Sequence, residues 1–225
     1  MKSTLTALAL TTALGFTHAA PTIDTTGASF GTVSPFGESN TATYGQTFLV
    51  TGAETRLQGF QLRLNDNLNS DFVDFAAYVY AWDGAKATGP QLWASGAQSS
   101  SNNGGADGME LFSFSTGGVD LVAGQQYVAF LSASNFFDGV NGTAFMELSN
   151  SDAYAGGNFV YFNNGNNFGA LTASTWDCAG SCIGGRDLWF KADFSAPNNQ
   201  VPLPASLYLV GIGLLTSGAL RRKAR

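Results

Sequence analysis

The sequence predicts an all-β protein, a two-sheet antiparallel sandwich of jelly-roll type. In the body of the chain apolar residues recur at every second position, which is the period of a β-strand. No stretch shows the 3.6-residue apolar period of an amphipathic helix. Runs rich in Gly, Asn and Ser separate the alternating segments, as they do in sandwiches with many short strands.

We expect roughly eight to ten strands at this spacing. The segment 73–82 is apolar or aromatic at both odd and even positions, which predicts a central strand covered on both faces. In 188–194 the even-numbered residues are predicted to form the buried face. Residues 116–118, Thr-Gly-Gly, are predicted to be a turn. Further strands are expected over residues 60–64, 112–114, 125–134, 144–148 and 158–162.

The amino terminus has the pattern of a signal peptide. Lys2 precedes an apolar run from Leu5 to Phe16, and Thr17-His18-Ala19 places small residues around a cleavage point after Ala19. We therefore expect a signal peptide over residues 1–19 and a mature chain that begins at Ala20. The alternative is an uncleaved anchor, but the apolar run is too short to span a bilayer.

The carboxyl terminus predicts a single transmembrane helix. Residues 203–220 carry no charge, and a helix of that length spans roughly 27 Å, just short of a ~30 Å hydrocarbon core. A basic cluster after this segment favours the cytoplasmic side, so the body is expected outside the cytoplasm. The chain then divides into a sandwich (20–194), a polar linker (195–200) and a tail (201–225). The basic cluster consists of Arg221, Arg222, Lys223 and Arg225.

This tail resembles the PEP-CTERM class of bacterial sorting signals, in the variant named after the letters VPLPA. The resemblance implies recognition by an exosortase, removal of the helix, and transfer from the inner membrane to the cell surface or an extracellular, exopolysaccharide-associated layer. The basic cluster would be the stop-transfer element. The alternative is a plain tail anchor with a proline-bearing linker. The recognition segment is Val201, Pro202, Leu203, Pro204 and Ala205.

Two segments of the body are similar to a sandwich domain common among PEP-CTERM cargo proteins. One is Trp82-Asp83-Gly84 at the end of a predicted strand, with its preceding residues, and the other is Gly124-Gln-Gln-Tyr127 before another strand. The resemblance covers about residues 45–194. It implies a fold and a surface setting, and no chemistry.

Composition excludes several classes of function. The body has a net charge of −11, from five basic and 16 acidic residues, which argues against nucleic acid as a partner. The one histidine, His18, lies in the predicted signal peptide, so His-dependent triads and His metal sites are excluded from the mature chain. Cys178 and Cys182 are expected to form a disulfide outside the cell. A zinc site lacks two further ligands.

Carbohydrate binding is the sharpest functional hypothesis for the body. Aromatic rings can stack on sugars while amide and carboxylate groups bond hydroxyls. The alternative is that these rings pack within or beneath the sheets, and alternation alone does not separate the two. The candidate platforms are Trp82, Trp93, Trp176 and Trp189, with Tyr78 and Tyr80.

Calcium is a weaker candidate. The run 65–71 offers oxygen ligands at Asp66, Asn67, Asn69 and Asp71, but it lacks the Gly and the distal Glu of an EF-hand loop. A polar turn is the alternative. Glycosidase activity needs two facing carboxyl groups, and the four Glu residues of the body are widely spaced. The sequence therefore predicts a non-enzymatic structural or interaction protein, with a carbohydrate-binding module and a glycosidase as alternatives.

Overall fold

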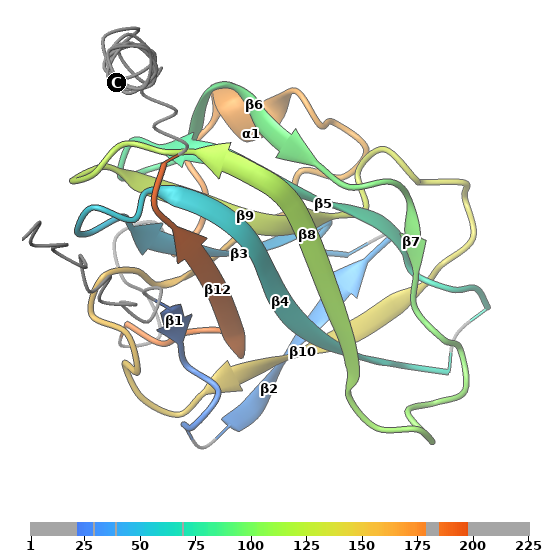
Figure 1. Cartoon of the computed structure of the whole chain (residues 1–225). Helices are drawn as coiled ribbons and strands as arrows, with labels where there is room; N and C mark the ends of the chain where they lie inside the picture. The colour runs from blue at the N-terminus through green and yellow to red at the C-terminus, as the bar shows by residue number, and fades with distance from the viewer. Residues whose placement is uncertain (1–21, 29, 39, 69, 179–184, 198–225) are drawn as a thin grey trace, which may run out of the picture.

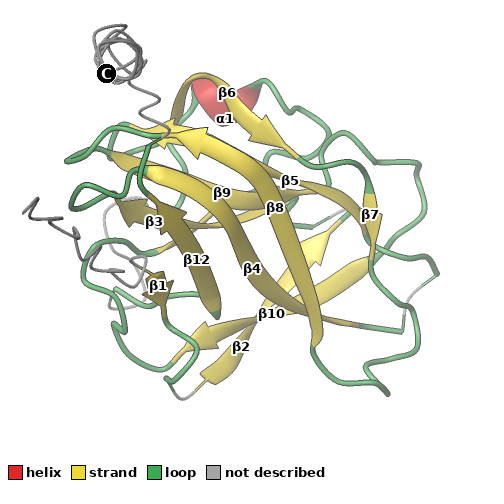
Figure 2. Ribbon diagram, in the orientation of Figure 1, coloured by secondary structure: helices red, strands yellow, loops and turns green. Residues whose placement is uncertain are grey.

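In a computed structural model, residues 22–28, 30–38, 40–68, 70–178 and 185–197 are described, and they form two six-stranded antiparallel sheets (Figure 1). Figure 2 shows strands and loops almost throughout, with α1 (Ala170–Ala173) as a single helical turn. In sheet A the order is β1 (Thr22–Asp24), β12 (Phe190–Ser195), β4 (Arg56–Asp66), β10 (Thr143–Ser149) and β2 (Phe30–Gly37), and β8 (Glu110–Asp120) also pairs with β4. In sheet B the order is β11 (Phe159–Phe162), β3 (Thr43–Leu49), β9 (Gln126–Ser132), β5 (Asp74–Trp82) and β6 (Ala87–Ala94), with β7 (Gln98–Ser99) beside β5.

Strand β4 organises sheet A because it pairs with three other strands. Its residues 56–62 pair with β12, residues 64–66 pair with β10, and β8 runs along residues 56–64. Both long pairings shift register near Gln58: β4 carries one extra residue relative to β12, whereas β8 carries two extra residues relative to β4. This bulge lets Leu57 and Phe60 both face inward, although they are three residues apart.

The main core lies between the inner faces of the two sheets. From sheet A it takes Phe60, Leu62 and Leu64 of β4 and the even-numbered residues of β12, as predicted. Alternate residues of β5 and β9 fill it from sheet B. Several of the core phenyl rings meet edge to face or stacked, which adds to their burial.

A second apolar cluster covers the outer face of sheet B. Tyr78, Tyr80 and Trp82 of β5 lie in it beside Phe130 of β9, and Trp176 closes it from the segment that contains α1. The Trp176 indole N–H donates to the Leu171 carbonyl at 2.8 Å. Strand β5 is therefore buried on both faces, as its sequence predicts.

The coarse prediction of an antiparallel sandwich is confirmed, and jelly-roll connectivity stays a prediction. The predicted turn at 116–118 is wrong, because these residues continue β8, with Gly117 and Gly118 at positive φ opposite the β4 bulge. Ser195, assigned to the linker, is the last residue of β12. The signal peptide and the tail lie outside the described residues.

We predict that Gly157→Ala destabilises the fold by about 2 kcal/mol or more. Gly157 is buried, and a Cβ there would collide with the backbone carbonyl of Thr47 on β3, so the segment that leads into β11 would have to move away from β3. Urea unfolding followed by fluorescence measures the loss. Gly96→Ala is the matched control, because a Cβ at Gly96 meets nothing within 4 Å. Equal stability of the two variants would contradict the close β3–β11 approach.

Candidate functional site

Asp66 is the centre of an acidic group at the end of β4. Its carboxylate is 2% exposed and accepts four hydrogen bonds from the loop after β7. Oδ2 accepts from the N–H groups of Asn103 and Gly104 at 2.7 and 2.8 Å, and Oδ1 accepts from the Gly105 N–H and the Ser101 hydroxyl, each at 3.1 Å. The carboxylate therefore holds the loop in shape.

Two further carboxyl groups lie beside Asp66. One oxygen each of Asp66, Asp107 and Glu110 fall within 4.8 Å of one another, an arrangement that could hold a metal ion. Glu110, however, accepts from the backbone N–H of Ser101, and it shares the single Ser101 hydroxyl proton with Asp66. A carboxylate has about four lone-pair positions, and backbone N–H groups take three of those of Asp66. The N–H groups that converge on Asp66 also disfavour a cation there.

The predicted calcium ligands are held by different partners. Asp66 binds the 101–105 loop, Asn67 donates its side-chain N–H to the Thr143 hydroxyl at 3.2 Å, and Asp71 accepts from the N–H of Phe72 at 2.8 Å. Asn69 lies outside the described residues. Calcium binding by this run stays a prediction.

Asp187 is a second buried carboxylate with a structural environment. It is fully buried and accepts from the Gln46 side-chain amide at 2.7 Å and from the N–H groups of Ala153 and Tyr154 at 2.8 and 2.9 Å. Burial is the largest influence on its pKa and raises it, against the hydrogen bonds. A substrate has no access to this group.

Neither carboxylate has the properties of a glycosidase acid. Burial alone would raise the pKa of Asp66, but the hydrogen bonds from Gly104, Ser101 and their neighbours lower it below its ordinary value. A general acid needs the opposite shift together with access to substrate. Asp66 lacks the raised pKa, and Asp187 lacks the access.

The candidate aromatic platforms are mostly buried, which corrects the stacking hypothesis for five of the six. Trp82, Trp176 and Trp189 are at most 8% exposed, so they have no free ring face for a sugar. Trp189 is covered by the Arg63 guanidinium at 4.1 Å. Trp93 is partly exposed and meets Phe60 and Phe114 edge to face. Tyr78 and Tyr80 are buried in the second cluster.

An open hollow of about 300 Å³, with polar and apolar groups in its lining, lies on the outer face of sheet A. Gly59 has no side chain to fill it, and a Cβ there would stand 2.6 Å from the Phe114 carbonyl oxygen. Gln61 donates its amide to the Ser113 hydroxyl at 3.0 Å across the β4–β8 pair. The lining is Gln58, Gly59, Phe60, Gln61, Ser113, Phe114, Ser115 and Asp193. Its amides, hydroxyls and carboxylate are groups that bind polyhydroxylated ligands.

A second open hollow, of about 430 Å³, brings together the two motifs that resemble cargo sandwich domains. Asp83 and Gly84 line it from the β5–β6 turn, and Gln125 and Gln126 line it from the start of β9. Strands β5 and β9 are neighbours, with Ala81 opposite Tyr127. Trp82 reaches the hollow with only 7% of its surface exposed.

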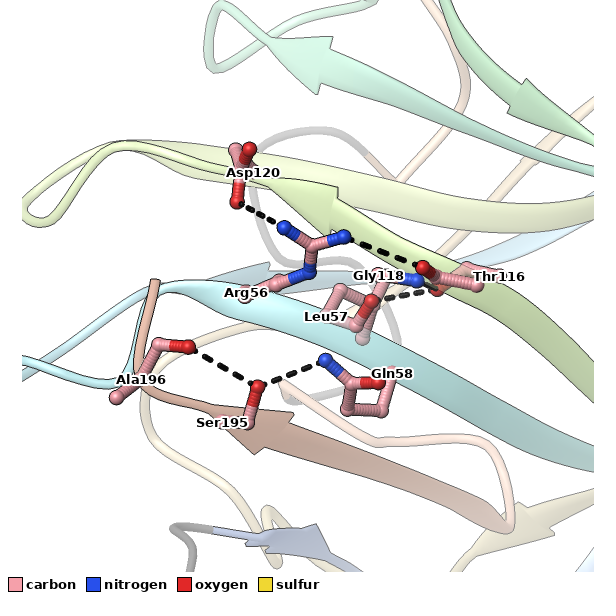
Figure 3. A network of polar contacts seen from close by, with 9 residues as sticks. Arg56, Leu57, Gln58, Thr116, Gly118, Asp120, Ser195 and Ala196 are labelled. Carbon is pink, nitrogen blue, oxygen red and sulfur yellow. Dashed lines mark hydrogen bonds and ion pairs between the residues drawn. The ribbon is translucent and has the colours of Figure 1, made fainter. Parts of the chain in front are cut away.

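A polar network fixes the point where the body leads into the tail (Figure 3). The Gln58 amide of the bulge donates to the Ser195 hydroxyl at 2.7 Å, and that hydroxyl donates to the Ala196 carbonyl at 3.2 Å. Arg56 lies 3.4 Å from Asp120 and donates to the Gly117 carbonyl. The end of β12 is thus bound to β4, and β4 to β8.

The remaining predicted site residues are only partly described. Cys178 is disulfide-bonded and takes a positive φ of 64°, and Cys182 lies outside the described residues. The sorting motif 201–205 and the basic cluster 221–225 also lie outside. Among the described residues, no helix has the length and apolar character to cross a membrane.

No family model matches the chain, and no curated protein matches it. Among solved structures, the chain is similar to the cysteine protease and lectin-like domains of Cwp84, a surface layer associated protein of Clostridium difficile. The identity is 11% and the TM-score 0.44, over 71% of this chain. The match spans 33% of that chain, and a likeness this distant carries no argument about function.

We predict that Asp66→Asn destabilises the protein by about 2 kcal/mol at pH 7, because the amide offers N–H groups where the loop already supplies donors. The lowered pKa of Asp66 stabilises the fold above the pKa of the unfolded chain, and this contribution disappears as the pH falls through the folded pKa. Urea unfolding at pH 7 and pH 3 should therefore show a smaller pH effect in the variant.

Asp107→Asn, at an exposed carboxyl of the same group, is the control and should change stability little. Thermal melts with calcium or EDTA complete the test. A melting temperature that rises with calcium and loses this response in Asp66→Asn would contradict a purely structural carboxylate.

Proposed function

We propose that this chain is an exported surface protein, processed at both ends, whose sandwich is a non-enzymatic structural or interaction module. In this proposal residues 1–19 are removed as a signal peptide. The tail 201–225 then holds the body on the outer side of the inner membrane. An exosortase acts at Val201–Ala205 and transfers the body to the cell surface or to an exopolysaccharide layer.

The position of β12 is the observation that carries this proposal. The last strand ends at Ser195, six residues before Val201, and the Gln58–Ser195 contact holds that end in sheet A. Removal of the tail would leave every described strand in place. The first strand begins at Thr22, three residues after Ala19, so cleavage of the leader would also leave the sandwich whole.

The acidic body is consistent with a role outside the cell. Its five basic residues are too few for binding to nucleic acid or to anionic lipid, while a net charge of −11 keeps an extracellular protein soluble.

We predict that changing Pro202 and Pro204 to Ala leaves the protein in the inner membrane, because the recognition segment would be lost. Deletion of 201–225 should instead release the body as an exported soluble protein. Cell fractionation and intact mass spectrometry of the protein from its native host measure both outcomes. The control is Pro197→Ala, in the linker and outside the motif. Normal processing of the Pro202 and Pro204 variant would contradict recognition by an exosortase.

Carbohydrate binding is the second candidate, favoured by the hollow on the outer face of sheet A. The hollow lies on a rigid strand pair, its floor is the bare backbone of Gly59, and Gln61 and Asp193 stand at its sides. These groups can bond several hydroxyls at once. A polysaccharide in the extracellular layer is the ligand that this function would need.

We predict that Gln61→Ala lowers the affinity for a retained glycan about tenfold, as expected for the loss of one or two hydrogen bonds. A glycan array identifies the ligand, and calorimetry measures the dissociation constant. Gln125→Ala, in the other hollow, is the matched control and should leave the affinity unchanged. If the array retains no glycan at high micromolar protein, or if Gln125→Ala alone weakens binding, the assignment to sheet A fails.

A further inference from the structure

A pocket of about 120 Å³ lies between the two sheets, beside the first residue of β1. Its apolar walls come from both sheets: Ile23 and Phe194 from sheet A, and Leu49 with Val50 from the end of β3. Thr22, Thr51, Glu54 and Tyr154 complete the lining. The Tyr154 hydroxyl is already bonded to the backbone of Leu49, as donor at 3.1 Å and acceptor at 3.2 Å.

Strand β1 begins beside this pocket. Thr22 lies opposite Asp193 and Ile23 opposite Ala192. If the antiparallel register continues for one further step in the mature chain, Pro21 would lie opposite Phe194. Because side chains alternate along a strand, Pro21 would then share with Ile23 the face of the pocket. Proline is tolerated in an edge strand such as β1.

The lining carries a single acidic side chain, Glu54, which is partly buried. Cleavage after Ala19 would create an α-ammonium group on Ala20. Only Ala20 and Pro21 would then precede Thr22, a reach of about 7 Å. In the uncleaved precursor the same nitrogen belongs to an uncharged peptide bond, and the leader would continue from it.

We propose that this pocket is the binding site for the new amino terminus of the mature chain. Pro21 fills its apolar part, and the Ala20 ammonium pairs with the Glu54 carboxylate. Signal-peptide cleavage then releases the body from the leader and also creates the amino terminus that fills this pocket of the sandwich. This inference rests on the cleavage site of the proposed function.

The test uses the chain from Ala20 to Arg225 in detergent, freed from a removable amino-terminal fusion so that the first residue is defined. NMR of the ¹³C-methylated α-amine measures the pKa of that group. A neighbouring carboxylate should raise this pKa by about one unit above its ordinary value near 8. Glu54→Gln should abolish the rise. Asp107→Asn, which also removes one carboxylate but at the far end of β4, should leave it intact.

A chain that starts at Thr22 tests whether docking as a whole stabilises the sandwich. It lacks both docking residues and should melt at a lower temperature than the chain from Ala20. A Gly-Ser extension before Ala20 should lower the pKa of the amine to its ordinary value. An ordinary pKa in the Ala20 chain, unchanged by Glu54→Gln, would overturn the docking. Mass spectrometry of the exported protein tests the cleavage itself, so a different first residue would overturn the processing separately.

Discussion

The pairing of β12 with β4 is the constraint on which the rest of the structure depends. The last strand of the body lies inside sheet A, between the first strand and β4, so Ser195 is paired with Arg56. Such distant pairing forms late, because its loop-closure entropy is lost before the contacts stabilise the chain. Sheet A cannot be completed until residue 195 is available, so in the proposed export route the sandwich would finish folding only after the whole body has crossed the membrane.

The sequence predicts some strands well, among them β5 and β12, but it misses β2, β3 and β6. Strands β5 and β12 were predicted because each buries a regular apolar face. Strands β2 and β6 contain Pro35 and the pair Gly89-Pro90, which are typical of turns, and both lie at the edge of a sheet, where proline is tolerated. Strand β3 contains Gly45, whose place beside Phe130 of β9 leaves no room for a Cβ. Because Phe130 is far away in the sequence, the local sequence pattern around Gly45 does not predict this contact.

The environments of the candidate site residues were also hard to predict from the local sequence. The burial of Trp82 depends on the segment that contains α1 and Trp176, which covers sheet B without a periodic pattern of its own. Asp66 was identified as an oxygen-rich turn residue, but its true partners are N–H groups near Gly104, 38 residues further along the chain. Their convergence turns a possible cation ligand into an anchor for a loop. The composition of the chain predicts which polar groups are present, whereas the pairing of the strands decides which partners these groups bind.

The geometry of the two termini also sets how the body would stand on the membrane. Thr22 and Ser195 leave the sandwich at the same end of sheet A, since β1 and β12 are antiparallel neighbours. In the proposed precursor, leader and tail both start from that end. The opposite end, about 35 Å along β4, carries the 66–74 and 101–110 loops, which contain acidic but no basic residues. In the proposed precursor, repulsion from anionic lipid would disfavour orientations that bring these loops close to the membrane, so they would face away from it.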